Sequence, residues 1–228
     1  WGGICAAPQF ISTFDQDDAR YKDNWIKGQQ YGSGGEPLIV QNGRFKDSLL
    51  VLVNAVPAID NSEAVHGYRL GKFEIKMGAT NRLGNDFPLF RYADVLLMKA
   101  ECLLRTGQAG AAAAIVTELR TRCFRDTPAK ATVTGADLMK GSSYDYGLRD
   151  IHATTYQGGA DVQYGRFLDE LGWEFFEECH RRQDLIRFGV FSKKSWLSHS
   201  ASEDFRKLFP IPQSERNKNT KLAQNPGY

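Results

Sequence analysis

Residues 91–107 read Arg-Tyr-Ala-Asp-Val-Leu-Leu-Met-Lys-Ala-Glu-Cys-Leu-Leu-Arg-Thr-Gly, the most strongly patterned stretch of the chain. Its large apolar residues fall at positions 92, 95, 96, 103 and 104, and Ala93 and Ala100 share a similar face. This spacing is typical of an amphipathic helix. Pro88 lies just before the stretch and Gly107 closes it, as is usual at helix boundaries. The pattern therefore predicts a helix over residues 91–106.

Residues 108–124 repeat the helical pattern directly after Gly107, with apolar positions at Ala112, Ile115, Val116, Leu119 and Cys123. Because the turn between the two helices is short, we expect an antiparallel hairpin. Small residues at positions 100 and 114 would let the helices pack closely, as they do in tetratricopeptide repeats. A single hairpin cannot bury its outer face, so further helices are expected to pack against it.

A third helix is predicted over residues 164–188, with Gly189 as its end. Its apolar stripe consists of Phe167, Leu168, Leu171, Phe175, Cys179, Leu185 and Ile186. Acidic residues occupy its first half and arginines its second half, the arrangement that the helix dipole favours. Glu177 with Arg181, and Glu178 with Arg182, are spaced as i,i+4 ion pairs worth about 0.3 kcal/mol each. The pattern predicts one continuous helix.

The remaining segments are less regular. Residues 1–45 are rich in glycine and polar residues and leave room for one short helix between positions 7 and 19. Residues 49–57 and 67–78 have the composition of strands. Residues 126–165 form a long polar insertion with four tyrosines, and a short helix is expected near its residue 134. Such an insertion is either a binding loop or a disordered segment.

The final stretch, residues 208–228, contains three prolines, which argue against a helix or a central strand. It also carries apolar residues, namely Leu208, Phe209, Ile211, Leu222 and Tyr228. A stiff tail with apolar anchors is expected to lie as a strap on the body of the protein.

Composition narrows the functional classes. The chain has 228 residues, 42% of them hydrophobic and 25% charged, a composition that is ordinary for a globular protein. Its net charge of +2 is too small to indicate nucleic-acid binding, which needs a clustered basic face. The longest apolar run, residues 49–53, is far shorter than the roughly 18 residues of a membrane span.

The four cysteines include no CxxC pair, so a zinc knuckle is not supported. Three of them lie in apolar helical stretches, where cysteine acts as a small hydrophobic residue. In the predicted hairpin Cys102 and Cys123 are too far apart to bridge.

Four ordered segments resemble the SusD/RagB family of outer-membrane nutrient binders. The helix at residues 87–107 is similar to the family pattern RYAE-LLL-AEA, and residues 116–122 resemble its IN-VR-RA helix. Residues 167–191, with His-Arg-Arg-Gln-Asp-Leu-Ile-Arg-Phe-Gly, resemble RR-EL-FEG-R--DL-RWG. The tail resembles PIP-SE…QNPGY, and the N-terminal stretch is similar only at scattered positions.

The resemblance implies a mainly α fold of tetratricopeptide-like helical hairpins packed with a loop-rich irregular lobe that contains short strands. On this basis residues 1–86 are expected to form the loop-rich lobe with the glycan-binding surface, and residues 87–228 the helical region with its extended tail. The implied function is non-catalytic capture of an oligosaccharide or polysaccharide at the cell surface and its delivery to a SusC-like TonB-dependent porin. Family chains are longer, so the lipid anchor of the outer-membrane protein is expected upstream, and Cys5 is not expected to carry it.

The candidate ligand-binding residues are aromatic side chains within polar loop sequence: Trp1, Tyr21, Trp25 and Tyr31. A flat indole or phenol ring can cover the apolar C–H face of a pyranose while polar neighbours bond its hydroxyls. The alternative is that these rings fill gaps between loops. Trp1 is favoured because of its place in the resemblance, and the tyrosines at 144, 146, 156 and 164 are weaker candidates. Trp173 is expected to be structural.

Other chemistries receive less support. Glu177 and Glu178 are adjacent on the predicted helix and cannot flank one bond, and Glu174 has cationic neighbours, so a glycoside hydrolase is only the third hypothesis. His180 and Asp184 make half a metal site at most, and no metal or cofactor is expected. The second hypothesis is a tetratricopeptide-like protein-interaction scaffold, or a peptide-nutrient binder of the same complex.

Overall fold

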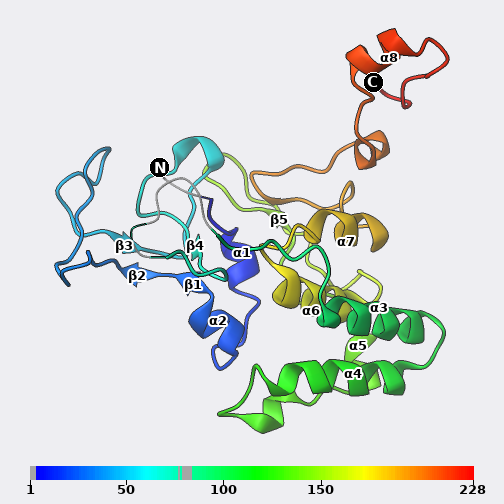
Figure 1. The fold of residues 1–228 in the computed structure, drawn as a ribbon, viewed down its shortest axis with the longest axis horizontal. Helices are drawn as coiled ribbons and strands as arrows, with labels where there is room; N and C mark the ends of the chain where they lie inside the picture. Colours follow the sequence, from blue (N-terminus) through cyan, green and yellow to red (C-terminus); the bar gives the residue numbers. More distant parts are fainter. Residues whose placement is uncertain (1–3, 77, 79–83) are drawn as a thin grey trace.

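The computed structural model describes residues 4–76, 78 and 84–228, and helices predominate over strands in it (Figure 1). The helices are α1 (Pro8–Ile11), α2 (Ala19–Asp23), α3 (Tyr92–Arg105), α4 (Ala109–Thr121), α5 (Gly135–Leu138), α6 (Gly165–Phe175), α7 (Arg181–Arg187) and α8 (Gln213–Lys218). The strands are β1 (Trp25–Ile26), β2 (Gly28–Gln29), β3 (Val51–Leu52), β4 (Arg69–Leu70), β5 (Gly147–Leu148) and β6 (Trp196–Leu197). Short 3-10 turns cover Ile59–Asn61, Pro128–Ala131 and Asp204–Lys207.

The predicted hairpin is confirmed, since α3 and α4 pack side by side and are joined by a turn at Gly107. Gly107 has a φ of 81°, which a side chain would disfavour. At the other end of α3, the Asp94 carboxylate accepts a hydrogen bond from the Arg91 N–H at 2.9 Å. This contact satisfies one of the free donors at the helix start.

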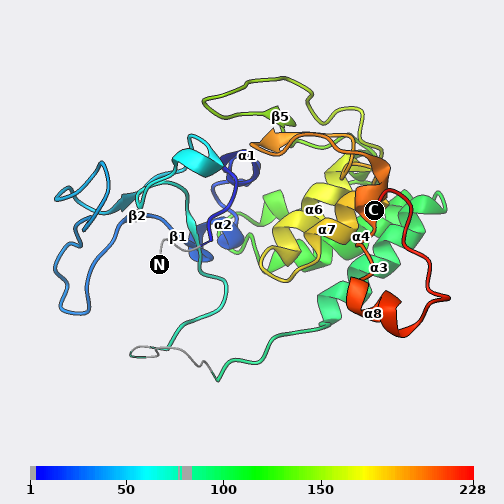
Figure 2. The same cartoon turned by 90° about the horizontal axis from the view of Figure 1, so that it is seen from above.

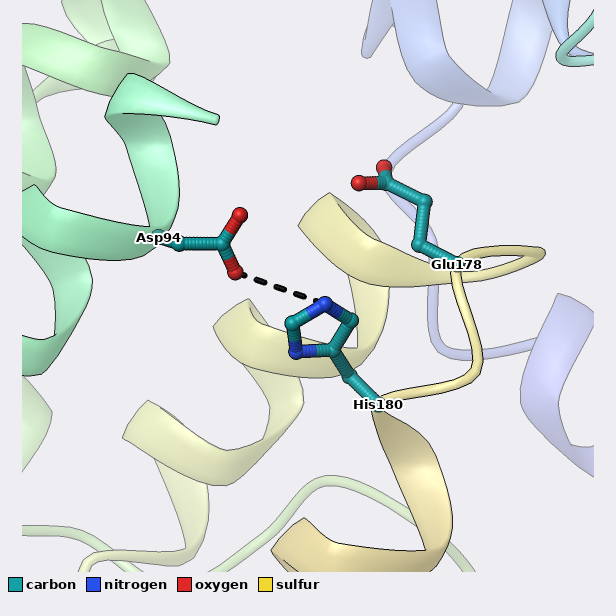
Figure 3. Close-up of side chains that lie close together, drawn as sticks. All are labelled: Asp94, Glu178 and His180. Atoms are coloured by element: carbon teal, nitrogen blue, oxygen red, sulfur yellow. Dashed lines mark ion pairs between the residues drawn. The ribbon is translucent and has the colours of Figure 1, made fainter. Parts of the chain in front are cut away.

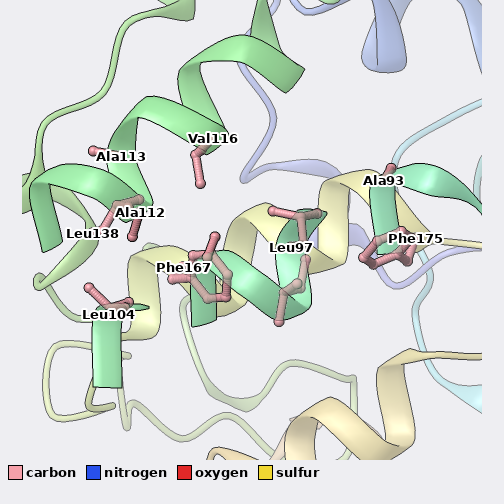
Figure 4. Packing of buried hydrophobic residues seen from close by; sticks show 11 residues of the cluster. Ala93, Leu97, Leu104, Ala112, Ala113, Val116, Leu138, Phe167 and Phe175 are labelled. Atoms are coloured by element: carbon pink, nitrogen blue, oxygen red, sulfur yellow. The ribbon is translucent and has the colours of Figure 1, made fainter. Parts of the chain in front are cut away.

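The main hydrophobic core lies where α3, α4, α5 and α6 meet (Figure 4). The large side chains with the lowest exposure in this core are Leu97, Leu104, Val116, Leu138 and Phe167. The insertion contributes to this core through α5, where the Thr134 hydroxyl caps the helix by accepting from the Asp137 N–H at 3.1 Å. The expected short helix near residue 134 is therefore confirmed, and this part of the insertion packs on the core.

The expected continuous helix over 164–188 is wrong, because the chain breaks between α6 and α7. Glu177 and Cys179 adopt positive φ values of 65° and 63°, which no helix accommodates. Neither expected i,i+4 pair forms: Glu178 instead pairs with Arg91, and the Arg182 guanidinium donates to the backbone carbonyls of Arg206 and Lys207. Tertiary contacts thus overrule the local helical pattern.

The small ladders of the N-terminal lobe lie at one end of the molecule and the α3–α4 hairpin at the other, with α1 and α2 between them in both views (Figure 1, Figure 2). The lobe holds α1, α2 and two small antiparallel ladders, β1 with β4 and β2 with β3, so the two expected strand segments shorten to two residues each. An aromatic cluster joins the lobe to α6, with Phe14 and Trp25 packed on Trp173 and Phe176. The lobe and the helices therefore share a core, and the division at residue 86 stays a prediction.

The C-terminal tail differs from the expected strap. It contains α8, which forms because the prolines stand outside it, with Pro212 immediately before its first residue. The tail closes on itself: the Tyr228 hydroxyl donates to the Leu208 carbonyl at 2.8 Å, and the Asn225 amide donates to the Phe209 carbonyl at 2.8 Å. Leu208 and Phe209 are largely exposed, so the tail folds mainly on itself (Figure 1). It contacts α7 through the Phe209 ring, whose centre lies 4.4 Å from the Arg182 guanidinium.

The four cysteines are free thiols, which agrees with the prediction that Cys102 and Cys123 are too far apart to bridge. Only Cys123 is buried as a small hydrophobic residue, whereas Cys102 and Cys179 are exposed. For those two, the expectation of a packed side chain is wrong.

Candidate functional site

A pocket of about 280 Å³ lies between the N-terminal lobe and the break that separates α6 from α7. Its walls include the aromatic rings of Phe10, Trp25, Tyr146, Phe176 and Trp196. A volume near 300 Å³ is at the lower end of small-molecule sites, which are mostly apolar and carry few polar groups. The pocket therefore has the size and lining for one compact ligand group.

Five separate segments supply these rings. Strand β1 brings Trp25, whose indole stacks on Phe176 at 4.5 Å between ring centres. The parallel pair of β5 with β6 brings the segment after Tyr146 beside Trp196. Gln9 ties α1 to this pair, because its side chain accepts from the Leu197 N–H at 2.6 Å and donates to the Gly147 carbonyl at 3.0 Å. The pocket is thus held by contacts between distant parts of the chain.

Three charged side chains also line the pocket: Glu177, Arg181 and Asp184. Asp184 forms an ion pair with Arg187 at 2.8 Å, and its burial raises the pKa of its carboxyl group. Glu177 accepts from the backbone N–H of Lys72 at 3.2 Å, and partial burial raises its pKa as well. Arg181 donates to the Leu168 carbonyl at 3.0 Å.

The predicted ligand residues occupy different environments. Trp25 lines the pocket and is only 5% exposed. Tyr21 is half-buried against the aromatic cluster, with the Lys27 ammonium 3.8 Å from its ring centre, and Tyr31 is 62% exposed. Trp1 lies outside the residues that the structure describes. Ligand binding by these four residues stays a prediction.

Three carboxylates of the α6 region lie in a buried network of ion pairs. Glu170 contacts Arg20 at 2.9 Å, Arg120 at 2.8 Å and Arg166 at 3.1 Å. Burial alone would raise its pKa, but the arginines lower it to about 2. A general acid needs a raised pKa, so Glu170 is unsuited to that role.

The next two carboxylates are engaged in the same way. Glu174 pairs with Arg20 at 3.3 Å and with Arg91 at 2.7 Å, and it also contacts Arg122. Glu178 pairs with Arg91 at 2.6 Å and contacts Lys72. Every one of the three carboxylates therefore faces cations, as in a structural network.

Asp94, Glu178 and His180 bring ligand atoms within 4.8 Å of one another (Figure 3). His180 Nε2 lies 3.4 Å from Asp94 Oδ1, and the imidazole stacks on Phe175 at 4.7 Å. The Glu178 carboxylate, however, is held by Arg91 and Lys72, whose positive charges oppose a cation at this point. We interpret the group as an ion-pair cluster. His180 thus contacts Asp94 instead of joining Asp184 as a ligand.

The comparison with protein families establishes which family the chain belongs to, because the model of the SusD family matches residues 6–205 and 193–228. The chain belongs to the SusD family. Proteins of this family are cell-surface lipoproteins of the outer membrane and are known as binding proteins. None of the helices in the described part of this SusD-family chain is both long and apolar enough to cross a membrane.

Two curated relatives support this membership. The starch-binding protein SusD of Bacteroides thetaiotaomicron is 31% identical over 153 residues, and the match covers 63% of this chain and 22% of that protein. The SusD-like protein P25 of Formosa agariphila is 32% identical over 151 residues, and the match covers 61% of this chain and 24% of that protein. The chain thus matches less than a quarter of the length of either relative.

Solved structures confirm the predicted SusD-like fold. NanU of Bacteroides fragilis superposes with a TM-score of 0.58 and 22% identity over 97% of this chain and 39% of that chain. A SusD-like protein of Bacteroides fragilis gives a TM-score of 0.60 and 16% identity over 100% of this chain and 48% of that chain. At these identities the similarity establishes the fold alone.

The sequence pattern of this SusD-family chain did not single out Phe10, Phe176 or Trp196 as pocket residues. Phe176 lies inside a stretch that resembles a continuous helix, and the other two are isolated aromatic residues. The tyrosines of the insertion were considered for ligand contact, and Tyr146 does line the pocket. Two sequence signals were therefore useful: the aromatic content of that insertion, and Trp25 as an aromatic residue within polar loop sequence.

Proposed function

We propose that this chain binds an oligosaccharide or polysaccharide without cleaving it. The supporting observation is the aromatic-walled pocket, in which the rings of Trp25, Phe176 and Trp196 converge. Aromatic rings cover the apolar faces of sugars, and polar groups at the rim bond the hydroxyls. The starch-binding name of one relative agrees with this chemistry.

The proposal places the glycan-binding surface over the pocket and the exposed ring of Tyr31, with Trp1 and Tyr21 as further contacts. In the parent protein, a lipid anchor upstream of this chain holds it at the cell surface. Bound glycan then passes to a SusC-like TonB-dependent outer-membrane transporter. Glu170, Glu174 and Glu178 are all paired with cations, so none of these three carboxylates is free to act as the general acid of a hydrolase.

Electrophoresis in gels that contain polysaccharides tests the binding step. We expect the wild-type chain to be retarded by at least one polysaccharide, and Trp1→Ala and Tyr31→Ala to reduce that retardation. Trp25→Phe is preferable to Trp25→Ala, because it keeps an aromatic ring in the core. Release of reducing sugar from the retarding polysaccharide would contradict the proposal and support a hydrolase.

A protein-interaction scaffold is the second candidate function, and one surface favours it. The outer face of α3 exposes Tyr92, Val95 and Met98 at helical spacing, with exposed fractions of 74%, 54% and 52%. A helix with apolar residues on two sides usually packs between two layers. Co-purification with the SusC-like transporter, without any retardation in polysaccharide gels, would favour this candidate.

A further inference from the structure

Glu177 and Arg181 differ from the other charged groups around α6. Both line the pocket, and neither has an ion-pair partner within 4.0 Å among the described residues. Their hydrogen bonds go to the backbone instead, from the Lys72 N–H to Glu177 and from Arg181 to the Leu168 carbonyl. Each side chain therefore keeps hydrogen-bonding capacity that the protein itself does not use.

The backbone keeps these two groups apart. In a continuous helix, Glu177 and Arg181 would be i,i+4 neighbours and would pair with each other. The break between α6 and α7 prevents this, at the expense of a left-handed conformation at Glu177 (φ 65°). Such a conformation at a residue other than glycine costs about 1–3 kcal/mol and is frequent at ligand sites.

Gly172 provides room for Arg181 in the same pocket wall. It lies inside α6, where glycine is about 0.5–1 kcal/mol less favourable than alanine. A Cβ atom at this position would lie 3.0 Å from the terminal Nη1 of Arg181 and 3.2 Å from the Phe10 ring. The absence of a side chain here therefore preserves the position of the guanidinium group.

The combination of groups indicates which ligand fits. A carboxylate accepts hydrogen bonds and a guanidinium donates them, whereas each hydroxyl of a sugar can do both. The apolar face of one pyranose ring matches the aromatic wall, and about 280 Å³ leaves room for one ring. Two carboxylates, Glu177 and Asp184, line the pocket against one guanidinium, so the carboxylate of a uronic acid would add a third negative charge. A purely apolar group would leave the charges of Glu177 and Arg181 without partners.

We infer that the pocket takes a single neutral pyranose residue at the end of a glycan chain, with Glu177 accepting from its hydroxyls and Arg181 donating to them. This inference rests on the proposed glycan binding and specifies its ligand class. A charge-assisted hydrogen bond contributes about 1.5–3 kcal/mol, so losing one corresponds to roughly a tenfold or greater loss of affinity.

Titration calorimetry with small sugars tests the inference, with the fluorescence of Trp25 and Trp196 as a second signal. The probes are the methyl pyranosides of glucose, galactose and mannose, with glucuronate and galacturonate as acidic counterparts. We expect at least one neutral glycoside to bind more tightly than either uronate. Glu177→Gln and Arg181→Met should each weaken it about tenfold or more, and Arg181→Lys should restore only part of the loss.

Exposed residues outside the pocket supply matched controls. Glu118→Gln and Arg125→Met make the same chemical changes there, and we expect wild-type affinity from both. Thermal unfolding confirms that each variant is folded. Failure of every neutral glycoside to bind, wild-type affinity in Glu177→Gln and Arg181→Met, or tighter binding of a uronate would each overturn the inference. If polysaccharides still retard the wild-type chain in such a case, the proposed function stands and only this inference fails. If no polysaccharide retards the wild-type chain, both the proposed function and this inference fail.

Discussion

At the scale of single residues, Trp25 and Tyr31 show how surroundings change the role of an aromatic ring. Trp25 stacks on Phe176 and makes an edge contact with Phe14 at 6.0 Å between ring centres, so it belongs to the core as well as to the pocket. Tyr31 is mostly exposed. Both lie in polar loop sequence, and only the folded structure distinguishes them.

This difference predicts unequal effects on stability. Trp25→Ala should lower the free energy of unfolding by about 3–5 kcal/mol, because it empties a packed site. Tyr31→Ala should change that free energy by about 0.5 kcal/mol or less. Urea denaturation followed by circular dichroism measures both values. A loss in Tyr31→Ala as large as that in Trp25→Ala would show that the exposed ring has an important packing partner.

Gly172 supports a second prediction at this scale. Gly172→Ala should weaken glycan binding several-fold, because the added Cβ would press on Arg181 and Phe10. Gly110→Ala, within α4, is the control, since nothing lies within 4 Å of its Cβ position. That control should leave binding unchanged and stabilise the protein by up to about 1 kcal/mol. Unchanged binding in Gly172→Ala would show that Arg181 can move without consequence.

At the scale of secondary-structure elements, the break between α6 and α7 is the main departure from the local pattern. The segment has helical periodicity, yet Glu177 and Cys179 are left-handed. The break lets Phe176 reach Trp25 and lets Glu178 reach Lys72 and Arg91. These contacts with distant segments offset the unfavourable backbone conformations.

The strain at this break can be measured through Cys179, whose side chain is exposed. Cys179→Gly should raise the free energy of unfolding by up to about 1 kcal/mol, because glycine adopts positive φ readily. Cys102→Gly, in the interior of α3, should lower it by a similar amount. Urea denaturation of both variants gives the comparison. Destabilisation of both to the same extent would argue against strain at Cys179.

At the scale of the whole molecule, buried ion pairs connect the N-terminal lobe to the helices. Arg20 follows the start of α2 and reaches both Glu170 and Glu174 on α6. Lys72 from the lobe and Arg91 before α3 meet at Glu178. Segments distant in sequence are therefore held together by ion pairs whose carboxylates are buried.

Removing one partner of this network should be strongly destabilising. Arg20→Met leaves Glu170 and Glu174 with fewer cations in a buried site, and we expect a loss of about 3 kcal/mol or more. Arg44 pairs with Glu63 at the surface, so Arg44→Met should lower stability by less than about 1 kcal/mol. Chemical denaturation of the two variants tests the contrast. Equal losses of stability in the two variants would mean that the buried ion pairs of Arg20 contribute no more to stability than the surface pair of Arg44 with Glu63.

The network also predicts sensitivity to acid. The arginines lower the pKa of Glu170 from 4.5 to about 2, so its contribution is complete above pH 4.5 and is lost as the pH falls towards 2. Glu101 and Glu178 have lowered pKa values and act in the same direction. Buried Asp169 has a raised pKa and opposes them in part. Thermal unfolding between pH 6 and pH 2.5 should show a midpoint that falls steeply below pH 4.5, and a flat profile would contradict this account.

Much of the fold followed from the sequence. The α3–α4 hairpin, the short helix at Thr134 and the family membership depend on features within short windows: apolar periodicity, a capping residue and ordered motifs. Glycine at position 107 marked the end of the first helix for a local steric reason. Such features can be predicted from the sequence because residues that are neighbours along the chain determine them.

The pocket and the charge network were decided by tertiary structure. Trp25 meets Phe176, and Arg20 meets Glu170, only after segments separated by some 150 residues pack together. The same packing accompanies the break between α6 and α7. No local pattern encodes these contacts, because their free energy comes from burial and charge pairing between distant parts of the chain.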